Sequence, residues 1–468
     1  MNDVVIIGAG LAGMVAAVRA AELGLKTVVL EAGSDADYMC NSRITGGIFH
    51  IAMNSILVDP AEARKNIAVA TGGYSDPGLA AALAENGRRA VDWLRTQGIR
   101  FIKGGPTPEF STVLAPPMLQ QFGTHWRGRG GDVLLRTLEK RLTEHGAAIT
   151  RSARVHSLLM EDGRCTGVEA ECNGQREQIL TQAVIIADGG FQADMDMVRR
   201  HISPAPSKLR QRNAQSGRGD GLRMAAQAGA KLVGLDRFYG HLLHRDAMFN
   251  ERLWPHPMVD SMAVSGMIVG ADACRFTDEG LGGVSMANAL ARLQDPLSAV
   301  VICDDAAWQG PARAAVLAPN PNLIKAGAQI VEATDLTGLA GELGLSPGQL
   351  TATVGSYNEA VANGRLGDLT PARTTHRWPA HAIERPPFRA VPVCAGITYT
   401  MGGIAIDASA RVLNHDACPI AGLYAAGAAT GGLEGGPLSG YTGGLSKASV
   451  FGLLAAEAAA AEVLKRAS

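Results

Sequence analysis

The chain has 468 residues, a formal net charge of -1 and 19% charged residues. This length exceeds what one hydrophobic core usually holds, so we expect two domains. No basic block interleaved with aromatic residues is present, which excludes nucleic acid as a partner and favours a small-molecule substrate.

The cysteines and the apolar runs of the sequence argue against a disulfide-rich, metal-binding, secreted or membrane protein. Seven cysteines, an odd number without C-x-x-C spacing, indicate neither a disulfide framework nor a metal or iron–sulfur site. A strand begins within three residues of Met1, and no apolar run reaches membrane-spanning length. We therefore expect no signal peptide, no membrane span, no bound metal and a cytoplasmic location.

The first predicted element carries the clearest motif of the chain. An apolar strand runs straight into the glycine-rich turn 8–13, and a second strand ends in Glu31 after the intervening helix. Gly8 permits the tight turn, Gly10 lets a pyrophosphate approach the backbone, and Gly13 allows close packing of helix and strand. Glu31, 18 residues beyond Gly13, is placed to bond a ribose hydroxyl. The motif predicts a Rossmann-type unit that binds an adenine dinucleotide.

The pattern of the remaining chain predicts a discontinuous architecture. In order, it predicts amphipathic helices over 78–98 and 131–145, a hairpin of strands 155–159 and 167–171, strands 178–180 and 183–187, and an alanine-rich helix over 444–463. Between residues 238 and 387 the glycine loops become rare, while prolines and histidines increase. We therefore expect a dinucleotide-binding domain over 1–237 and 388–468, with a second domain inserted at 238–387.

Five segments, in order, resemble the flavoprotein subunits of fumarate reductase and succinate dehydrogenase, with their relatives tricarballylate dehydrogenase and 3-ketosteroid dehydrogenase. They are the glycine turn with Glu31, Asn41–Gly47, Asp188–Phe191, Gly219–Gly221, and Thr400–Gly403 leading to Gly422–Gly427. The resemblance spans nearly the whole chain. It implies an α/β fold in which a discontinuous Rossmann-type FAD-binding domain carries an inserted α+β capping domain, with substrate held between the cap and the flavin.

The resemblance also implies non-covalent FAD and a set of residues that bind it. These are Gly8, Gly10, Leu11, Ala12, Gly13, Glu31, Ala32, Asn41, Ser42, Thr45, Gly46, Gly47, Val155, Asp188, Gly189, Asp220, Gly427, Gly444, Leu445 and Ser446. Cys40 stands where succinate dehydrogenases attach a histidine to flavin; a cysteinyl link is the alternative to the quiet thiol that we expect. Ala428 replaces a glutamate that usually contacts the cofactor.

Three polar anchors of the fumarate reductases are changed in this chain. The arginine expected four residues after the Arg-Phe-x-x-Glu motif at 275–279 is Gly283, and the histidine before Thr-Met-Gly-Gly is Tyr399. The C-terminal arginine is replaced by Ser439 or Tyr441. Because tyrosine cannot reproduce a bidentate arginine clamp, we do not expect fumarate or succinate as the substrate.

Two features point to different substrates. The segments around Asn41 and Tyr441 are most similar to tricarballylate dehydrogenases, whereas tyrosines beside the flavin are similar to ketosteroid dehydrogenases. A polycarboxylate substrate needs basic side chains to bind its carboxylates. The loop that contains His125, Arg127 and Arg129 is the best candidate to provide them. A solvated basic loop is an equal alternative.

The predicted function is that of an FAD-dependent oxidoreductase acting on CH–CH groups. It would dehydrogenate, or reduce, a bond next to a carbonyl or carboxylate, as tricarballylate dehydrogenases do. Tyr441 or Tyr399 is expected to move the proton, while Arg127 or His244 polarises the carbonyl. The alternatives are a ketosteroid-dehydrogenase-like enzyme, an accessory flavoprotein with an electron-transfer partner, and an amine or amino-acid oxidase.

Other polar residues of the inserted domain are weaker candidates. His241 is spaced by three from His244, as metal ligands on a helix are, but no acidic third ligand accompanies them. A single histidine such as His256 is more often structural than catalytic. Arg275 and Glu279 favour a structural ion pair over a proton route.

Overall fold

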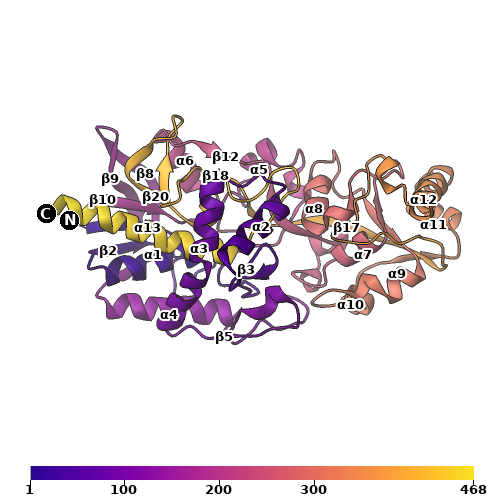
Figure 1. The fold of residues 1–468 in the computed structure, drawn as a ribbon, viewed down its shortest axis with the longest axis horizontal. Helices are drawn as coiled ribbons and strands as arrows, with labels where there is room; N and C mark the ends of the chain where they lie inside the picture. The colour runs from indigo at the N-terminus through magenta and orange to yellow at the C-terminus, as the bar shows by residue number, and fades with distance from the viewer. Residues whose placement is uncertain (1, 468) are drawn as a thin grey trace.

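The structure, a computed structural model, describes residues 2–467 and consists of two lobes along one long axis (Figure 1). The first lobe is built on the sheet around β1 (Asn2–Ile7), and the second on the sheet around β17 (Phe388–Thr400). The start of β1 and the end of α13 (Gly444–Ala467) lie together at one end of the molecule, while α11 (Leu336–Leu343) and α12 (Pro347–Ala362) lie at the other.

β1 occupies the middle of the first sheet because Val4, Val5 and Ile6 are fully buried and pair on both sides. Its parallel neighbours are β10 (Gln175–Ile186) and β2 (Thr27–Leu30), and the parallel core is extended by β20 (Pro419–Ala425) and β7 (Ala148–Thr150). A parallel sheet with apolar residues on both faces needs cover on both faces. The predicted strand–turn–helix–strand unit is confirmed.

The helices of the first lobe pack closely on one another. α1 (Leu11–Glu22) follows the glycine turn and contacts both α13 and α4 (Gly130–Glu144), while α13 also contacts α3 (Pro77–Thr96). A Cβ on Gly452 would lie 2.7 Å from Ala12 O, so glycine lets α13 cross α1 closely. The three long helices predicted from periodicity are all present, with ends shifted by a few residues.

An antiparallel meander extends the first sheet. It consists of β8 (Ala153–Glu161), β9 (Arg164–Cys172) and the first half of β10, and β19 (Arg411–Leu413) pairs with β20 at the edge. Asp162 and Gly163 have φ of 46° and 75°, which forms the predicted hairpin turn. The two strands predicted over 178–180 and 183–187 are one continuous strand.

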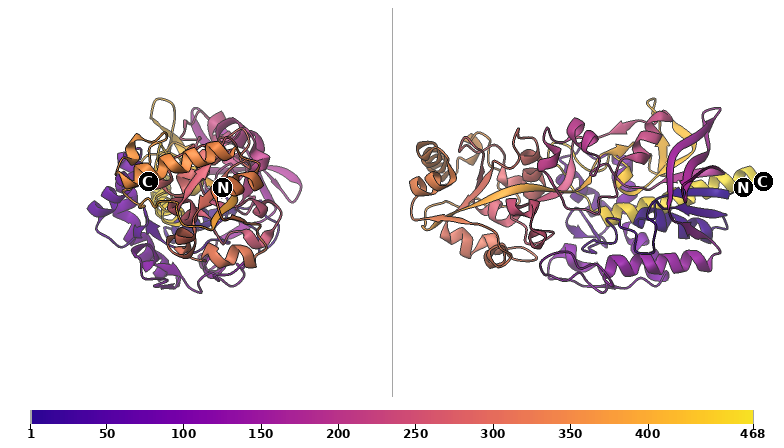
Figure 2. Two further views of the ribbon diagram at one scale, coloured as in Figure 1. Left: turned by 90° about the vertical axis from the view of Figure 1, so that its right-hand side faces the viewer. Right: turned by 180° about the vertical axis from the view of Figure 1, so that it is seen from behind.

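β17 is the centre of the second sheet and reaches from that lobe to the junction with the first (Figure 2). Its partners are β11 (Arg210–Gln211), β13 (Phe238–His244), β15 (Val300–Cys303) and β16 (Val331–Ala333), and β14 (Met267–Val269) pairs with β15. Sheet membership thus places residues 388–400 in the second lobe, whereas the predicted division put them with the first. The division into domains itself stays a prediction.

Shorter elements complete the fold. The helices are α2 (Pro60–Thr71), α5 (Met195–His201), α6 (Asp220–Gln227), α7 (Asp260–Ser265), α8 (Gly283–Ala291), α9 (Asp305–Gln309) and α10 (Pro319–Lys325). The strand pairs are β3 (His50–Ile51) with β4 (Asn54–Ser55), β5 (Phe101–Ile102) with β6 (Val113–Leu114), and β12 (Leu232–Val233) with β18 (Gly403–Ile404). The predicted α/β fold class is confirmed. Within residues 2–467, no helix has the length and apolar character needed to cross a bilayer.

Candidate active site

A cavity of about 480 Å³ lies where the two lobes meet. Gly10 and Glu31 of the first lobe contribute to its lining, as do Tyr239, His241 and Tyr399 of the second. β17 delivers Tyr399 to this junction, where Thr400 Oγ1 accepts a hydrogen bond from Phe191 N at 3.1 Å. The cavity therefore joins the predicted cofactor motif to polar groups of the second lobe.

The glycine turn has the shape that a dinucleotide requires. A Cβ on Gly13 would lie 1.9 Å from Gly8 O, and one on Gly8 would lie 2.8 Å from Ala187 O, so only glycine fits these positions. A Cβ on Gly10 would meet only Ser42 Oγ, at 3.6 Å. The space over Gly10 is therefore open to the cavity at the N-terminus of α1, where a pyrophosphate finds free N–H groups and a favourable dipole.

Acidic and hydroxyl groups around the turn are fixed by the backbone. Glu31 accepts hydrogen bonds from Ala9 N at 2.9 Å and Gly33 N at 2.8 Å, which holds its carboxylate at the cavity wall. Asp188 Oδ1 is buried without a hydrogen-bond partner, and burial raises the pKa of Asp188 to about 7. An orphaned polar atom in the lining fits a polar cofactor group. These residues fit FAD.

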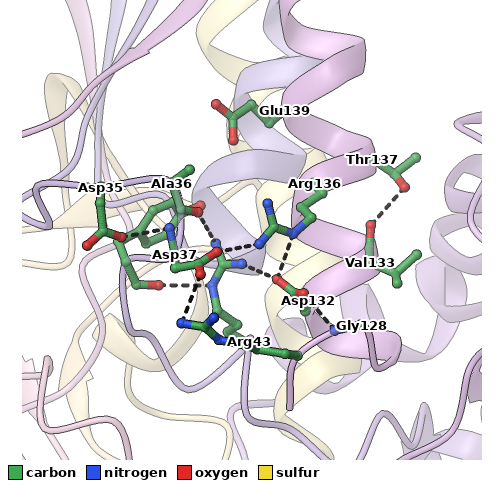
Figure 3. Close-up of polar contacts among 12 residues, drawn as sticks. Asp35, Ala36, Asp37, Arg43, Gly128, Asp132, Val133, Arg136, Thr137 and Glu139 are labelled. Carbon is green, nitrogen blue, oxygen red and sulfur yellow. Dashed lines mark hydrogen bonds and ion pairs between the residues drawn. The ribbon is translucent and has the colours of Figure 1, made fainter.

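A buried ion pair anchors the loop that carries Asn41 and Ser42. Figure 3 shows Arg43 between the segment Asp35–Asp37 and Asp132 of α4, with which Arg43 pairs. Arg43 also donates to Tyr38 O at 2.9 Å, and Tyr38 donates to Ala9 O in the glycine turn at 2.8 Å. One network thus connects α4, this loop and the turn.

Most residues predicted to bind FAD line this cavity. The exceptions are Gly13, which packs on Gly8, and Ser446, which donates to His50 O at 2.7 Å. Cys40 also lines the cavity, and burial raises the pKa of its thiol to about 11. A protonated thiol is a poor nucleophile, which favours the expected non-covalent cofactor. The individual cofactor contacts stay predictions.

Three tyrosines from separate elements gather in the cavity wall. Tyr239 of β13 pairs across the sheet with Tyr399 of β17, and its ring stacks on Tyr441 from the segment before α13. Tyr399 donates to the buried carboxylate of Glu434 at 2.9 Å, and the Tyr441 hydroxyl accepts from Gly444 N at 3.1 Å. The predicted pair Tyr399 and Tyr441 is thus brought together, and Tyr239 was missed.

Burial controls the ionisation of these phenols. It raises the pKa of Tyr399 well above its usual value, and the negative charge of Glu434 adds to the rise. Burial likewise raises the pKa of Tyr441, together with the neighbouring Tyr239. For Tyr239 itself, the rise in pKa caused by burial is partly opposed by the cation of Arg212. All three phenols are therefore neutral and able to donate hydrogen bonds at physiological pH.

Tyr239 is also connected to a histidine and an aspartate. His241 Nε2 lies 2.9 Å from the Tyr239 hydroxyl, and His241 Nδ1 lies 2.5 Å from Asp260 Oδ2. A Cβ on Gly283 would lie 2.0 Å from Asp260 Cγ, so the glycine at the expected arginine position leaves room for this carboxylate. Tyr239 and His241 lie two residues apart on one strand, a signal that the sequence contained.

Arg212 brings a positive charge into the same region. Its guanidinium donates to Thr398 Oγ1 at 3.0 Å, its Nε is buried without a hydrogen-bond partner, and no described carboxylate pairs with it. The other two cations of the described lining do have carboxylate partners, since Arg154 pairs with Asp220 and Lys447 with Glu434. Arg212 lies between β11 and the Asn213–Gly219 loop, where nothing in the sequence indicated a site.

Two histidines of the lining are held neutral. Burial and the charge of Arg377 lower the pKa of His50 to about 4, and His50 packs edge-on against Tyr441. Burial, with the charges of Arg212 and His241, lowers the pKa of His256 to about 3. Neutral imidazoles at these places add hydrogen-bonding capacity to the wall without adding charge.

Two predicted catalytic residues do not reach the cavity. Arg127 has a 75% exposed side chain and pairs with Asp37 at 3.2 Å, so the alternative of a solvated basic loop describes it better. His244 is fully buried on the other face of β13 and bonds Gln329 O at 2.8 Å. Their positions do not support the prediction that either residue polarises a substrate carbonyl, and strand alternation turns His244 away from His241.

The second lobe contains the expected ion pair and no metal cluster. Arg275 and Glu279 are both buried and paired, with Arg373 close to the same carboxylate. His241 and His244 lie on a strand rather than a helix. Within residues 2–467, no group of three or more histidine, cysteine and acidic side chains is arranged to hold a metal ion.

Comparison with known proteins identifies the family. The family described as FAD binding domain matches residues 3–441. The chain belongs to this family. The chain is 26% identical over 480 residues to the NADH:fumarate oxidoreductase of Klebsiella pneumoniae (strain 342), covering 98% of this chain but 47% of that protein. It thus spans about half the length of that relative.

Other relatives match over more of their length. The 4-oxocyclohexanecarboxylate 2-dehydrogenase of Sinomonas cyclohexanicum is 27% identical over 535 residues, covering 94% of this chain and 89% of that protein. The fold is shared with 3-ketosteroid Δ1-dehydrogenase from Sterolibacterium denitrificans, with a TM-score of 0.74 at 20% identity over 98% and 99% of the two chains.

These matches decide several predictions. The resemblance to fumarate reductase and succinate dehydrogenase flavoproteins is confirmed, and so is FAD as the cofactor. At the level of the family, the predicted class of FAD-dependent oxidoreductase is also confirmed. The cytoplasmic location stays a prediction.

Proposed function

We propose that this protein, with FAD bound, dehydrogenates or reduces a carbon–carbon bond next to a carbonyl or carboxylate. The observation that carries the proposal is the gathering of Arg212 and three neutral tyrosines in the wall of the cavity that the cofactor motif also lines. A cation can bind the activating oxygen of the substrate, and a phenol can exchange a proton with the adjacent carbon.

The supply of positive charge argues for a substrate with one carboxylate or carbonyl. Arg212 alone among the arginine and lysine side chains of the described lining lacks a carboxylate partner. A tricarboxylate in a partly apolar site would need more cations than this, because an unpaired buried charge is costly. The specific likeness to tricarballylate dehydrogenase is therefore the weaker proposal, and a monocarboxylate or ketone is favoured.

Apolar side chains elsewhere in the cavity wall suit an apolar substrate body. The lining includes Met53, Leu119, Trp254, Met258 and Val316. Apolar walls with a few polar groups orient small ligands by burial and select them by hydrogen bonds. A ring that carries a carboxylate or ketone, the chemistry named in the Sinomonas relative and in the ketosteroid dehydrogenases, fits this combination.

The residues of the chain divide the work as follows. FAD supplies the hydride acceptor or donor. Arg212 holds the activating oxygen and stabilises negative charge on it, Tyr441 donates a hydrogen bond, and a phenol of the cluster gives or takes the proton. The proposal includes a separate protein that exchanges electrons with the flavin. In the alternative, accessory role, this electron-transfer protein would be the only redox partner of the flavin.

Substrate binding tests the proposed class. The FAD-loaded protein is titrated without oxygen with 4-oxocyclohexanecarboxylate, a 3-ketosteroid, succinate and tricarballylate while the flavin spectrum is recorded. We expect the ring compounds to perturb or bleach the flavin band at lower concentration than tricarballylate. A preference for the tricarboxylate would contradict the assignment of Arg212 as the single cationic anchor. The control is Arg127→Met, which removes a charge outside the cavity lining and should leave the titrations unchanged.

A further inference from the structure

We infer that Tyr239, His241 and Asp260 form a proton relay that serves the substrate end of the cavity. The inference rests on the proposed function, because it names the group that gives or takes the proton of that reaction. Its basis is a continuous chain of contacts from the cavity wall through Tyr239 and His241 to Asp260.

The contacts fix the direction of each hydrogen bond. An ionised carboxylate only accepts, so His241 Nδ1–H donates to Asp260 Oδ2. His241 Nε2 then accepts from the Tyr239 hydroxyl when the imidazole is neutral, and donates to it when the imidazole is protonated. Asp260 Oδ1 accepts from Leu242 N at 2.8 Å, which holds the carboxylate beside the strand. Only one imidazole nitrogen is thus left to exchange a proton with the phenol.

The relay connects the cavity with the solvent side of the second lobe. His241 lines the cavity, whereas Asp260 is outside the lining and its side chain is 21% exposed, so protons can leave or arrive through Asp260. Gly283 at the start of α8 leaves the room that the Asp260 carboxylate occupies. A group between a buried phenol and water is what a proton relay requires.

Other charged and titratable groups surround the relay. Arg212 faces Tyr239 and Asp260, and His256 faces His241 and has its pKa lowered to about 3, so it stays neutral and does not compete for the proton. Tyr441, Tyr399 and Glu434 also face Tyr239. Tyr399 donates to Glu434, which is fully buried and paired with Lys447, whereas Tyr239 is bonded to a partly exposed imidazole.

The proton transfer balances in both directions. In reduction, Tyr239 gives its O–H proton to the substrate carbon while the Nε2–H bond of protonated His241 breaks to restore the phenol, and water later reprotonates the imidazole. In dehydrogenation the substrate C–H bond breaks, its proton goes to the Tyr239 oxygen, and the phenolic proton moves to neutral His241. The electron pair stays with the substrate, and the adjacent carbon exchanges its hydride with the flavin of the proposed function.

A comparison of two histidine–aspartate pairs tests the relay. The variant Asp260→Asn removes the relay carboxylate, and the control Asp246→Asn removes the carboxylate 3.5 Å from His244, which lies outside the cavity. The dithionite-reduced, FAD-loaded protein is mixed with 2-cyclohexenone or acrylate from pH 5 to 9, and flavin reoxidation is followed. Because the Asp260 carboxylate is the hydrogen-bond acceptor of His241 Nδ1, the relay predicts that Asp260→Asn changes the pH profile of flavin reoxidation. Asp246→Asn should leave it unchanged.

Tyr239→Phe separates the chemical step from folding. We expect flavin reoxidation to slow by at least about 100-fold with the flavin still bound, because general acid catalysis contributes at least that much. A pH profile that is the same in wild type and Asp260→Asn, or a Tyr239→Phe variant with the wild-type rate, would overturn the relay.

If no acceptor reoxidises the flavin, that result counts against the proposed function and not against the relay. A spectroscopic measurement then still tests the relay. In protein labelled with [15N]histidine, the relay predicts a single His241 tautomer with the proton on Nδ1, assigned by comparison with His241→Asn. Asp260→Asn should change its nitrogen shifts, and Tyr239→Phe should change that of Nε2. A His241 signal that neither variant moves would show that the contacts do not exist, which rejects the relay independently of activity.

Discussion

The rings of Tyr239 and Tyr441 stack with centroids 3.9 Å apart and 17° between their planes. Tyr239 belongs to the second lobe and Tyr441 to the segment that leads into α13 of the first. This contact therefore joins the two lobes in the wall of the cavity. It also places two hydroxyl groups at the same end of the cavity, so each can be tested separately.

Replacement of Tyr441 by phenylalanine should keep the stack and remove one hydroxyl. We expect FAD to remain bound and turnover to fall by about 10- to 100-fold, because a hydrogen bond to the substrate oxygen is lost. Stopped-flow flavin reduction at saturating substrate measures the change. Unaltered turnover would remove the Tyr441 hydroxyl from the chemistry and leave it a structural role at Gly444 N.

Two glycine variants separate cofactor binding from folding. Gly10→Ala meets only Ser42 Oγ in the protein, so we expect a folded chain that has lost FAD, because the methyl group occupies the pyrophosphate space. Gly13→Ala would clash with Gly8 O at 1.9 Å and should destabilise the turn itself. Circular dichroism and flavin absorbance distinguish the two outcomes. A Gly10→Ala variant that retains FAD would mean that the cofactor lies elsewhere.

The Arg43–Asp132 ion pair should contribute strongly to stability. Burial acts to raise the pKa of Asp132, but hydrogen bonds from Gly128 N and Arg136 and the charge of Arg43 lower it overall. We expect Asp132→Asn to cost about 3–5 kcal/mol of unfolding free energy and to weaken FAD binding, because Arg43 is left unpaired in the interior. Its control, Asp92→Asn, disrupts the exposed pair with Arg95 and should cost less than about 1 kcal/mol. Urea unfolding with equal losses in both variants would contradict this account.

Arg212 should determine substrate affinity rather than cofactor affinity. We expect Arg212→Met to weaken binding of a ring carboxylate by about 10- to 100-fold, the value of one charge-assisted hydrogen bond, with partial recovery in Arg212→Lys. FAD affinity should stay unchanged. Fluorescence titration of FAD and spectral titration of substrate report the two constants. A loss confined to FAD binding would place Arg212 at the cofactor instead.

His50 should make stability depend on pH. Its pKa is lowered from the usual 6.5 to about 4 by burial, so between these values the unfolded chain binds a proton that the folded chain does not. Stability due to His50 is therefore complete above pH 6.5 and falls by up to about 3 kcal/mol as the pH approaches 4. His50→Asn keeps a hydrogen-bond acceptor for Met53 N and removes the titration, so urea midpoints at pH 5 and pH 7 should differ less than in wild type. An unchanged difference would contradict the buried, neutral histidine.

Local patterns placed most of the proposed cofactor residues in the lining of one cavity. Gly8, Gly13 and Glu31 follow from short spacings and from steric rules that act within one strand–turn–helix unit. The long helices followed from periodicity, because each buries one face on its neighbours. The proposed catalytic half could be predicted less well, since Tyr239 and Tyr441 are brought together by tertiary packing alone.

The errors have equally physical reasons. His244 was chosen over His241 although strand alternation sends them to opposite faces, and the bulge beside Tyr239 is not visible in the sequence. Arg212 lies in no recognisable sequence motif. It is proposed as the substrate anchor because no carboxylate within residues 2–467 pairs with it. Lys447 in an alanine-rich helix was a usable sign of a buried ion pair, here with Glu434.

An anaerobic absorbance experiment tests the central claim most directly. The purified protein is incubated with FAD, separated from free cofactor, reduced with dithionite and mixed with 2-cyclohexenone, acrylate or fumarate; the oxidised form is mixed with the corresponding saturated compounds. We predict that FAD remains bound and that at least one α,β-unsaturated acceptor restores the oxidised flavin band, or one saturated donor bleaches it. The proposed carbon–carbon oxidoreductase would be contradicted by a protein that takes up no FAD. It would also be contradicted if the bound flavin exchanged electrons with none of these compounds but did so rapidly with a redox protein or a quinone.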